Sequence, residues 1–559
     1  DDTESRVLRF RNIHYVAAGA SLMGAAAHGA YEYDAAEGED PIYYNHRFPH
    51  VSTIDACQNC HNQHTLEIRY EKCAECHTEG ANPTLHDTPD WVYDIRHVGS
   101  LQDYDGDGDA DEGIYYELET LGEKVYAAIQ AYATAQGNPI VYDSHSYPYW
   151  FNADANGDPD GSYSHWTARL VRAAYNYQYW QKDPGLFAHN GKYGIEFLYD
   201  TLKSFYDYDN TLVPDFTLLA RNDTGHFDNT AEAFRHWDED GDVSSRCAQC
   251  HSPGGFAFAA RFGIAPIESY PYGDGFACEQ CHEPDGFDQA DPPRYFVASV
   301  TFPSGVTIEN DEANPDDSFL CMTCHQGRES KATVDDDIAI GRWSFNNIHY
   351  LAAGPSLYGA DAAVGYEYDD NSAIGQQTYV GKWGHYSQPN GGDGADSQCA
   401  FCHLSDHSFL PQSNEGCGCH GNPSDIQSIR TNRGTDYNGN GDANEKLKDE
   451  VQTFGNRVLL AMQAYTVREG LAFIVYDPDA YPYFFDDQGN RYGDWDAPLM
   501  KASFNYQFWI KEHGSWAHNT HYVLQLLYDS INDLQTASPL NGDVDLLTTP
   551  TTLTRPGTY

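Results

Sequence analysis

Short motifs of cysteine and histidine recur along the chain and account for all 14 of its cysteines. Six have the form Cys-x-x-Cys-His, and the seventh, Cys417-Gly-Cys419-His420, is one residue shorter. Two thiols at this spacing can form thioether bonds to both vinyl groups of one haem, and the next side chain can then bind the iron through its imidazole. A zinc site needs cysteine pairs matched into fours and has no use for a histidine after every pair. The motifs therefore predict seven c-type haems.

Each regular motif supplies two cysteines and one proximal histidine. These residues are Cys57, Cys60, His61, Cys73, Cys76, His77, Cys247, Cys250, His251, Cys278, Cys281, His282, Cys321, Cys324, His325, Cys399, Cys402 and His403. The short motif is predicted to hold the seventh haem, since cysteines this close are poor disulfide partners. Its shorter spacer is expected to strain one thioether.

The second ligand of each iron decides what the haem can do. A haem with one histidine can bind substrate, whereas a haem with two is suited to passing electrons. Four histidine positions recur in both copies of an internal repeat, and an unconstrained surface histidine has no reason to recur in step with the haem motifs. The segment between the copies offers two more. The candidate distal ligands are His14, His50, His64, His189, His226, His236, His349, His385, His407 and His518.

That intervening segment has three haem motifs but only two free histidines. At least one of its irons must therefore take a ligand from a flanking module or from another subunit. Of the remaining histidines, seven without a counterpart in the other copy are predicted to be ordinary surface or hydrogen-bonded residues. They are His28, His86, His97, His145, His165, His513 and His521.

The repeat that positions these residues is visible in the sequence. The segment from Phe10 to Asp34 returns as Ser344 to Asp369, and the haem pair from Cys57 to His77 returns as Cys399 to His420. We therefore expect a two-haem module at residues 1–205, a three-haem insert at 206–342, a second two-haem module at 343–537 and an extended tail at 538–559. The tail either packs on a neighbour or is loose.

Apolar residues at helical spacing predict three helices in each module. They span about 116–136, 164–182 and 190–204 in the first module, and 447–469, 498–511 and 520–533 in the second. The insert ends in two short apolar runs around Pro303-Ser-Gly305, which predict a hairpin. Only roughly 80 residues serve each haem, so the haems must supply much of the apolar core. The expected fold class is mainly α with extensive irregular coil, wrapped round a haem chain.

Acidic loops in both modules resemble calcium-binding loops, with oxygen ligands at alternate positions and glycine at the sixth. The twelfth position is Ile114 or Leu447, so the bidentate glutamate is missing and Glu112 or Glu117 would be late ligands. The alternative is a set of solvated Asp/Gly turns. The candidate ligands are Asp103, Asp105, Asp107, Asp109 and Asp111, then Asp436, Asn438, Asn440, Asp442 and Asn444, and in a shorter cluster Asp238, Asp240 and Asp242.

The formal net charge of the chain is -52, with 84 acidic against 32 basic residues, which excludes nucleic acid as a partner. Thioether haem is attached outside the cytoplasm, so we expect an exported protein, extracellular or on the cell surface. The chain opens at Asp1 without a charged or apolar leader, as expected of a form whose signal peptide has been removed. No run of about 18 apolar residues predicts a membrane span.

Several motifs together resemble the exported multihaem c-type cytochromes of metal- and sulfur-respiring microbes. They are Asn12-Ile-His14-Tyr15, His64-Thr-Leu-Glu67, Thr224-Gly-His-Phe-Asp228 and Cys321-Met-Thr-Cys-His-Gln-Gly-Arg-Glu-Ser330. Within that group the chain is similar to the cytochromes that polymerise into extracellular filaments, the cytochrome nanowires. The resemblance implies bis-histidine haems in alternating parallel and T-shaped pairs, with one ligand often donated across the subunit interface. The Cys417-Gly-Cys419 spacing departs from that pattern.

The expected function is an electron conduit, in which closely spaced haems carry electrons along the chain and between identical subunits toward an extracellular acceptor. The chain would then be an electron-transfer protein and not an enzyme. One alternative is a multihaem oxidoreductase, for instance of nitrogen or sulfur oxyanions, with one five-coordinate catalytic haem. The other is a monomeric periplasmic electron shuttle.

Overall fold

The computed structural model describes most of the chain and divides it into two compact units. The described residues are 2–35, 42–47, 50, 56–74, 77, 89–96, 100, 102–222, 242–271, 273, 275–283, 293–349, 351–384, 398–403, 409–411, 425–430, 434–539 and 552–557. The first unit comprises Asp1–Ala259, Ile264–Tyr295 and Asp406–Ser408, and the second comprises Ala260–Gly263, Phe296–Ser405 and Phe409–Tyr559. The expected insert at 206–342 is therefore shared between them.

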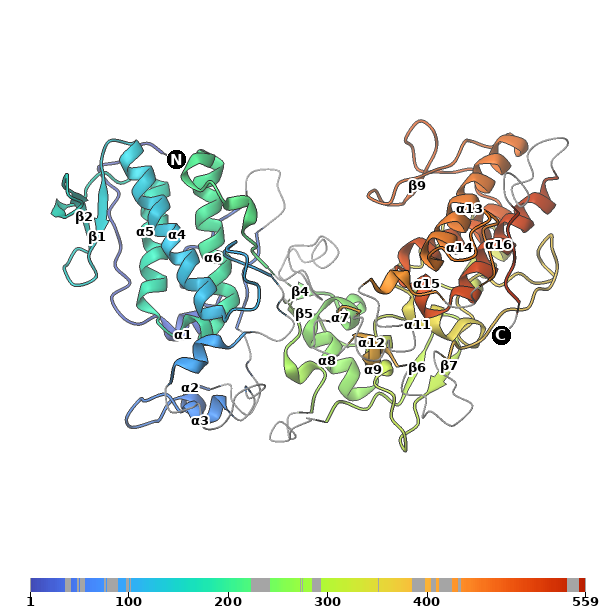
Figure 1. The fold of residues 1–559 in the computed structure, drawn as a ribbon, viewed down its shortest axis with the longest axis horizontal. Helices are drawn as coiled ribbons and strands as arrows, with labels where there is room; N and C mark the ends of the chain where they lie inside the picture. The colour runs from blue at the N-terminus through green and yellow to red at the C-terminus, as the bar shows by residue number, and fades with distance from the viewer. Residues whose placement is uncertain are drawn as a thin grey trace. The chain divides into compact units, whose positions relative to one another are not determined.

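Three long helices form the core of the first unit: α4 (Ile114–Ala135), α5 (Ala168–Lys182) and α6 (Leu186–Tyr208). They lie side by side in Figure 1. Helix α4 buries Leu118, Leu121, Val125 and Ile129, a helical spacing that places all four on one face. This apolar face packs on α5 and α6 and gives the unit its main hydrophobic cluster.

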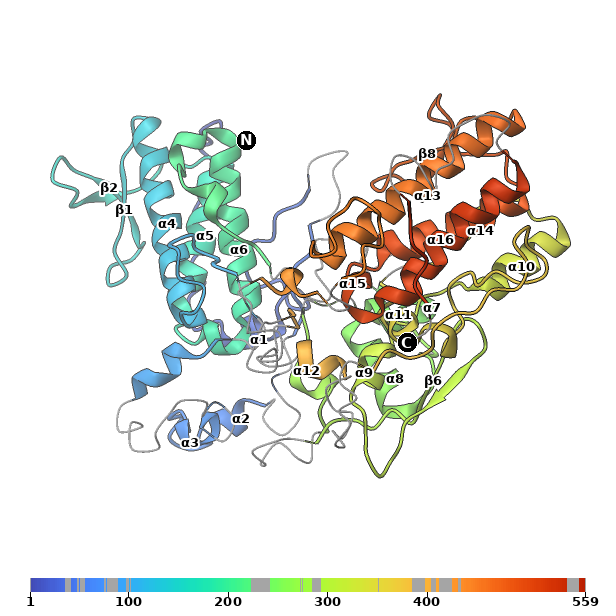
Figure 2. The ribbon, with the colours of Figure 1, turned by 45° about the vertical axis from the view of Figure 1, so that its right-hand side comes forward.

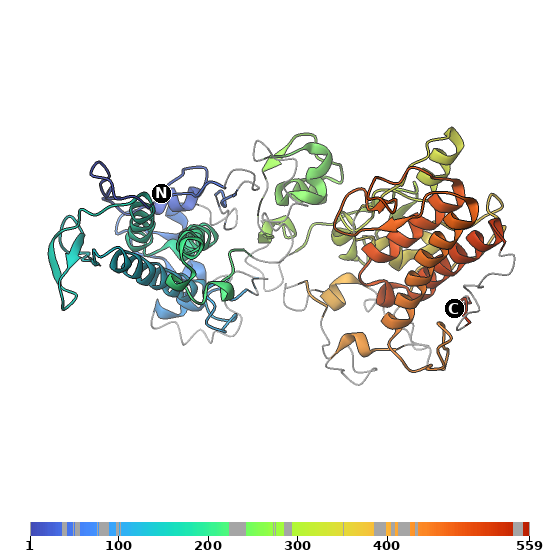
Figure 3. The same cartoon turned by 90° about the horizontal axis from the view of Figure 1, so that it is seen from above.

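The second unit repeats this arrangement with α13 (Leu447–Glu469), α14 (Ala497–Lys511), α15 (Ser515–His518) and α16 (Thr520–Ala537). Helices α13, α14 and α16 remain together in the turned views of Figures 2 and 3. A glycine sits at the same helical position in both units, Gly122 in α4 and Gly455 in α13. A Cβ atom there would lie 2.7 Å from the ring of Trp180 and 2.2 Å from that of Trp509, so only glycine lets the tryptophan pack this closely.

The remaining elements are short. In the first unit they are α1 (Ala18–Met23), α2 (Cys57–Cys60), α3 (Tyr70–Cys73), η2 (Pro89–Asp94), β1 (Ile140–Tyr142), β2 (Trp150–Ala153), β3 (Pro159–Ser162), η3 (Asn210–Leu212), η4 (Phe216–Leu218), β4 (Asp242–Val243), α7 (Ser245–His251), β5 (Tyr270–Pro271) and η6 (Cys278–Gln280). Helix α8 (Pro253–Phe262) contributes residues to both units. In the second unit they are β6 (Ser299–Thr301), β7 (Thr307–Glu309), α9 (Ser318–Met322), α10 (Lys331–Ile340), α11 (Ala353–Tyr358), η8 (Gly359–Asp361), α12 (Cys399–His403), η11 (Ile426–Ser428), β8 (Val475–Tyr476) and β9 (Phe484–Phe485).

The mainly helical fold class and the six expected helices are confirmed, with ends that differ by a few residues. The hairpin of the insert is also confirmed, because β6 pairs antiparallel with β7 and Val300 faces Ile308. The sequence did not predict the antiparallel strands around the two Tyr-Pro-Tyr segments, β1-β2-β3 and β8-β9. Among the described residues, no helix is both long and apolar enough to cross a membrane. Wrapping of the fold round a haem chain remains a prediction.

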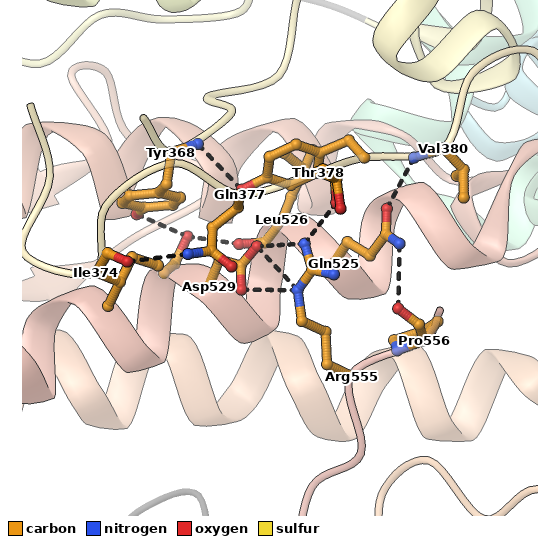
Figure 4. A network of polar contacts seen from close by, with 12 residues as sticks. Tyr368, Ile374, Gln377, Thr378, Val380, Gln525, Leu526, Asp529, Arg555 and Pro556 are labelled. Carbon is orange, nitrogen blue, oxygen red and sulfur yellow. Dashed lines mark hydrogen bonds and ion pairs between the residues drawn. The ribbon is translucent and has the colours of Figure 1, made fainter. Parts of the chain in front are cut away.

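In each unit, an arginine outside the predicted two-haem modules pairs with a buried aspartate. We call the residues around this arginine the closing segment of the unit. In the second unit, Figure 4 shows Arg555 bound to Asp529, with Nη2 to Oδ2 at 2.7 Å, and to the carbonyl oxygen of Thr378 at 2.9 Å. In the first unit, Arg221 binds Asp200 at 2.9 Å in the same way. Residues 552–557, part of the expected extended tail, thus pack on their own unit. The shared pattern of Leu219-Ala-Arg221 and Leu553-Thr-Arg555 is the signal that could have found them.

Replacing Arg555 with alanine should lower the free energy of unfolding of the second unit by about 3 kcal/mol, since it leaves the buried Asp529 carboxylate without its cation. Guanidinium titration followed by circular dichroism measures the loss. Arg221→Ala should act similarly on the first unit, whereas the exposed Arg6→Ala should change little. Equal unfolding curves for Arg555→Ala and Arg6→Ala would contradict the role of this ion pair.

Candidate cofactor sites

The haem-attachment motifs share a helical turn. The backbone N–H of His61 donates to the carbonyl oxygen of Cys57 at 2.8 Å, and the N–H of His325 donates to that of Cys321 at 2.9 Å. The same bond recurs in the motifs that begin at Cys73 and Cys278. A helical turn places residues i, i+3 and i+4 on one face, so both sulfur atoms and the imidazole can meet one cofactor. Cys76 and the motif Cys417, Cys419 and His420 lie outside the described residues.

Three pairs of histidine rings stand at the separation that a shared iron would require. With a metal–nitrogen bond of about 2 Å and about 1 Å more to each ring centre, two imidazoles on one iron have centres about 6 Å apart. The ring centroids of His61 and His189 are 6.4 Å apart, and those of His403 and His518 are 6.3 Å apart. The third pair, His50 and His77, has centroids 5.9 Å apart. Each pair joins a proximal histidine to an expected distal one.

His189 and His518 are held by a kink that interrupts a helix. His189 precedes Asn190, which leaves the helical conformation within α6 at φ -168° and ψ 78°, and His518 precedes Asn519 at φ -164° and ψ 78°. The Asn190 side chain then accepts a hydrogen bond from the N–H of Tyr193, which caps the next helical segment.

Buried carboxylates fix the orientation of both rings. The Nδ1 atom of His189 lies 2.9 Å from Oδ1 of Asp183, and Nδ1 of His518 lies 2.9 Å from Oε2 of Glu512. Asp183 is 1% exposed and Glu512 is 2% exposed. A carboxylate accepts a hydrogen bond from Nδ1–H, which leaves Nε2 as the nitrogen free to bind a metal.

The two proximal rings of the same pairs are oriented through the backbone. Nδ1 of His61 lies 3.2 Å from the carbonyl oxygen of Leu66, and Nδ1 of His403 lies 2.9 Å from that of Phe409. Both acceptor residues have positive φ, 62° for Leu66 and 58° for Phe409. This left-handed turn brings the carbonyl back to the ring, and Nε2 again remains for the iron.

Burial, and at His518 also a neighbouring carboxylate, shifts the pKa of four of the paired rings. It lowers the pKa of His77 to about 4, with a smaller contribution from repulsion by His50, and it lowers the pKa values of His50 and His403. For His518, burial also favours the neutral ring, but attraction to the Glu512 carboxylate outweighs it and raises the pKa. Metal binding requires the neutral imidazole, and a lowered pKa favours that form in His50, His77 and His403.

Attachment motifs also lie next to one another. The thiols of Cys321 and Cys399 are in hydrogen-bonding contact, which lowers the pKa of Cys399 to about 7, and the N–H of Cys399 donates to Oγ of Ser318 at 2.8 Å. In the first unit, Cys60 is close enough to Cys73 to raise its pKa further, beyond the larger effect of burial. Haems attached at these neighbouring cysteines would be neighbours too.

The other expected distal ligands differ in exposure and in whether they lie among the described residues. His14 is exposed and has φ 72°, and its counterpart His349 is partly buried and has φ 81°. His64 is exposed, and His226, His236, His385 and His407 lie outside the described residues. Of the histidines expected to be ordinary, His28 pairs with Glu32, His165 with Glu4, and His521 with the Tyr437 hydroxyl.

The acidic loops bring carboxylates together in both units. Burial raises the pKa of Glu112 to about 7, and repulsion from Asp105, Glu117 and other carboxylates adds to this shift. Burial raises the pKa of Glu117 to about 7 as well, although Arg96 opposes it. In the shorter cluster, Asp238 and Asp240 lie outside the described residues, and Asp242 is exposed at the start of β4.

Comparisons with known proteins agree with the attachment motifs. The chain is 32% identical over 259 residues to the C-type polyheme cytochrome OmcB of Geobacter sulfurreducens, covering 41% of this chain and 32% of that protein. It is 30% identical over 256 residues to the C-type polyheme cytochrome OmcC of the same organism, covering 41% of this chain and 31% of that protein.

The chain therefore spans about a third of the length of these curated relatives. No family model and no solved structure matches it. The resemblance to multihaem c-type cytochromes that the Cys-x-x-Cys-His motifs indicated is thereby confirmed over 41% of the chain.

Proposed function

We propose that the chain is a heptahaem c-type cytochrome that conducts electrons through closely spaced haems with two histidine ligands each. Haem supplies the one-electron chemistry when bound, and the residues of the chain hold it, orient its ligands and exclude other reactions. The observation that carries the proposal is the set of three histidine pairs with ring centroids 5.9 to 6.4 Å apart. A site for substrate would instead leave one face of an iron without imidazole.

The proposed axial partners follow from those pairs. His189 serves the haem of Cys57 and Cys60, and His50 serves the haem attached at Cys73. In the second module, His518 serves the haem of Cys399 and Cys402. The sequence repeat then assigns His385 to the haem of the short motif, because His385 occupies the position of His50.

Neighbouring motifs support a continuous path for electrons. The contact of Cys321 with Cys399 joins the insert to the second module, and the proximity of Cys60 to Cys73 joins the two haems of the first module. The tether of each thioether is only one side chain long, so haems attached at adjacent cysteines are held close to each other. Close spacing is what electron transfer between cofactors requires.

We further propose that the protein acts outside the cell as a homopolymer. The insert holds three haem motifs and only two free histidines, so a ligand must come from elsewhere. His14 is suited to this role because it is exposed and lies next to the exposed Tyr15 and Val16.

Electron microscopy of the purified holoprotein at neutral pH tests the polymer. We expect filaments for the wild type and discrete particles for His14→Ala, because the exposed ring would no longer bind the iron of a neighbour. His165→Ala is a matched control, since His165 contacts Glu4 and is expected to leave assembly unchanged. Discrete wild-type particles at every concentration would refute polymerisation.

Replacement of a distal histidine tests the conduit itself. We expect uniformly low-spin spectra for the wild type, whereas His518→Ala or His189→Ala should convert one haem of the seven to a high-spin form that binds carbon monoxide when reduced. Electronic and electron paramagnetic resonance spectra measure this change, with His165→Ala as the control. Carbon monoxide binding by the wild type would favour a catalytic haem, and unchanged spectra for both variants would rule out the assigned ligands.

The carboxylate that accepts a hydrogen bond from each of these histidines should lower the reduction potential of the haem that the histidine binds. A hydrogen bond from Nδ1–H to Glu512 increases the electron density of the imidazole and stabilises ferric iron. Glu512→Gln should therefore raise the reduction potential of one haem by roughly 40 mV, which corresponds to about 1 kcal/mol for one electron. Spectroelectrochemical titration gives the value, and Asp183→Asn is the equivalent change in the first unit. A lowered or constant potential in both variants would contradict this role.

A further inference from the structure

Two acidic loops share the same pattern of backbone hydrogen bonds but have different side chains at their centres. The first loop is residues 103–112 of the first unit, and the second loop is residues 436–445 of the second unit. In the first loop, Asp103 accepts hydrogen bonds from the N–H groups of Gly106 at 2.6 Å and Gly108 at 2.8 Å. In the second loop, Asp436 does the same for Gly439 and Gly441. Both aspartates are thus engaged in shaping their loops.

In each unit, a glutamate on the following helix pairs with an arginine and accepts a hydrogen bond from the backbone of the loop. Glu117 pairs with Arg96 at 2.6 Å and accepts from the N–H groups of Tyr104 at 2.9 Å and Asp105 at 3.0 Å. Glu450 pairs with Arg430 at 2.5 Å and accepts from the N–H of Tyr437 at 2.7 Å. These glutamates hold the loops on their helices, and their oxygens already face an arginine or a backbone N–H of the loop.

The centre of the first loop holds three carboxylates, and two of them, Asp105 and Glu112, each have a buried oxygen without a hydrogen-bond donor among the described residues. Ligand atoms of Asp105, Asp107 and Glu112 lie within 4.8 Å of one another. Asp105 is 0% exposed, its Oδ1 accepts from the N–H of Asp107 at 3.0 Å, and its Oδ2 has no hydrogen-bond partner among the described residues. Oε1 of Glu112 is buried and likewise has no partner within that part of the chain. Buried anionic oxygens without donors are unfavourable unless a cation neutralises them.

In the second loop, asparagine side chains donate hydrogen bonds to the glutamate. Asn438 and Asn440 stand where the first loop has Asp105 and Asp107. The Nδ2 atom of Asn438 donates to Oε1 of Glu445 at 2.7 Å, and Nδ2 of Asn440 donates to the same oxygen at 2.8 Å. Two N–H groups therefore satisfy the glutamate from within the protein. Its equivalent in the first loop, Glu112, faces two carboxylates that can donate nothing when ionised.

We propose that the first loop binds one calcium ion through Asp105, Asp107 and Glu112, and that the second loop, whose asparagine amides take the place of the cation, binds none. Calcium suits an all-oxygen site on a loop, since it accepts six to eight oxygen ligands in flexible geometry and can complete its shell with water on the exposed side at Asp107. Magnesium is a poorer match because it demands a nearly ideal octahedron. The site does not depend on the haem assignments.

The test exchanges the central aspartates and asparagines of the two loops in the holoprotein. After chelation and re-equilibration with calcium in excess magnesium, elemental analysis should find one calcium per wild-type chain. Asp105→Asn/Asp107→Asn, which copies the second loop, should lose that ion and keep its haem spectrum and helical circular dichroism. Asn438→Asp/Asn440→Asp should gain a second ion. Asp442→Asn removes an acidic residue from the second loop and should leave the count at one.

Calcium should also raise the thermal unfolding midpoint of the wild type and leave that of Asp105→Asn/Asp107→Asn unchanged, because a ligand stabilises only a protein that binds it. This second readout separates a bound ion from ions attracted weakly to the acidic surface. A wild-type protein that retains no calcium would overturn the proposal. So would an Asp105→Asn/Asp107→Asn variant that binds calcium as tightly as the wild type.

Discussion

The constraint on which the proposed haem sites depend is the placement of two imidazole rings about 6 Å apart, as in the pairs His61–His189 and His403–His518. A flexible side chain would lose much of its binding free energy to ordering, so a ring that is already held would bind a metal more tightly. The chain achieves this with a helix that breaks at Asn190 or Asn519 and a buried carboxylate, Asp183 or Glu512, behind the ring. The long helices of each unit fix the positions of these residues.

The two copies of the repeat share several interactions and differ in others. The histidine–carboxylate contact, the glycine beneath the tryptophan and the arginine that closes the unit occur in both copies. The centres of the acidic loops do not match, because aspartates in one copy are asparagines in the other. The contacts around the candidate haem ligands are therefore shared by both copies, whereas the hydrogen bonds around Glu112 and Glu445 differ.

Helices and attachment motifs were predictable because their signals are local. Leu118, Leu121 and Val125 follow helical spacing within one segment, and Cys57, Cys60 and His61 lie within one turn. The closing segments were missed because their stability comes from one distant ion pair and not from an apolar period. Arg555 contacts Asp529 and Thr378, which are 26 and 177 positions away in the sequence. The β1-β2-β3 sheet was missed because its strands are only three or four residues long.

The sequence by itself determined that the chain carries haem attachment motifs, how many there are and which helices frame them, because spacing along the backbone dictates these features. It also narrowed the distal ligands to a small set by their recurrence. Only the tertiary structure decided which rings meet, as with His61 and His189, and which buried oxygens lack a donor, as with Asp105. Both depend on distances between residues far apart in the chain, and those distances exist only once the helices have packed.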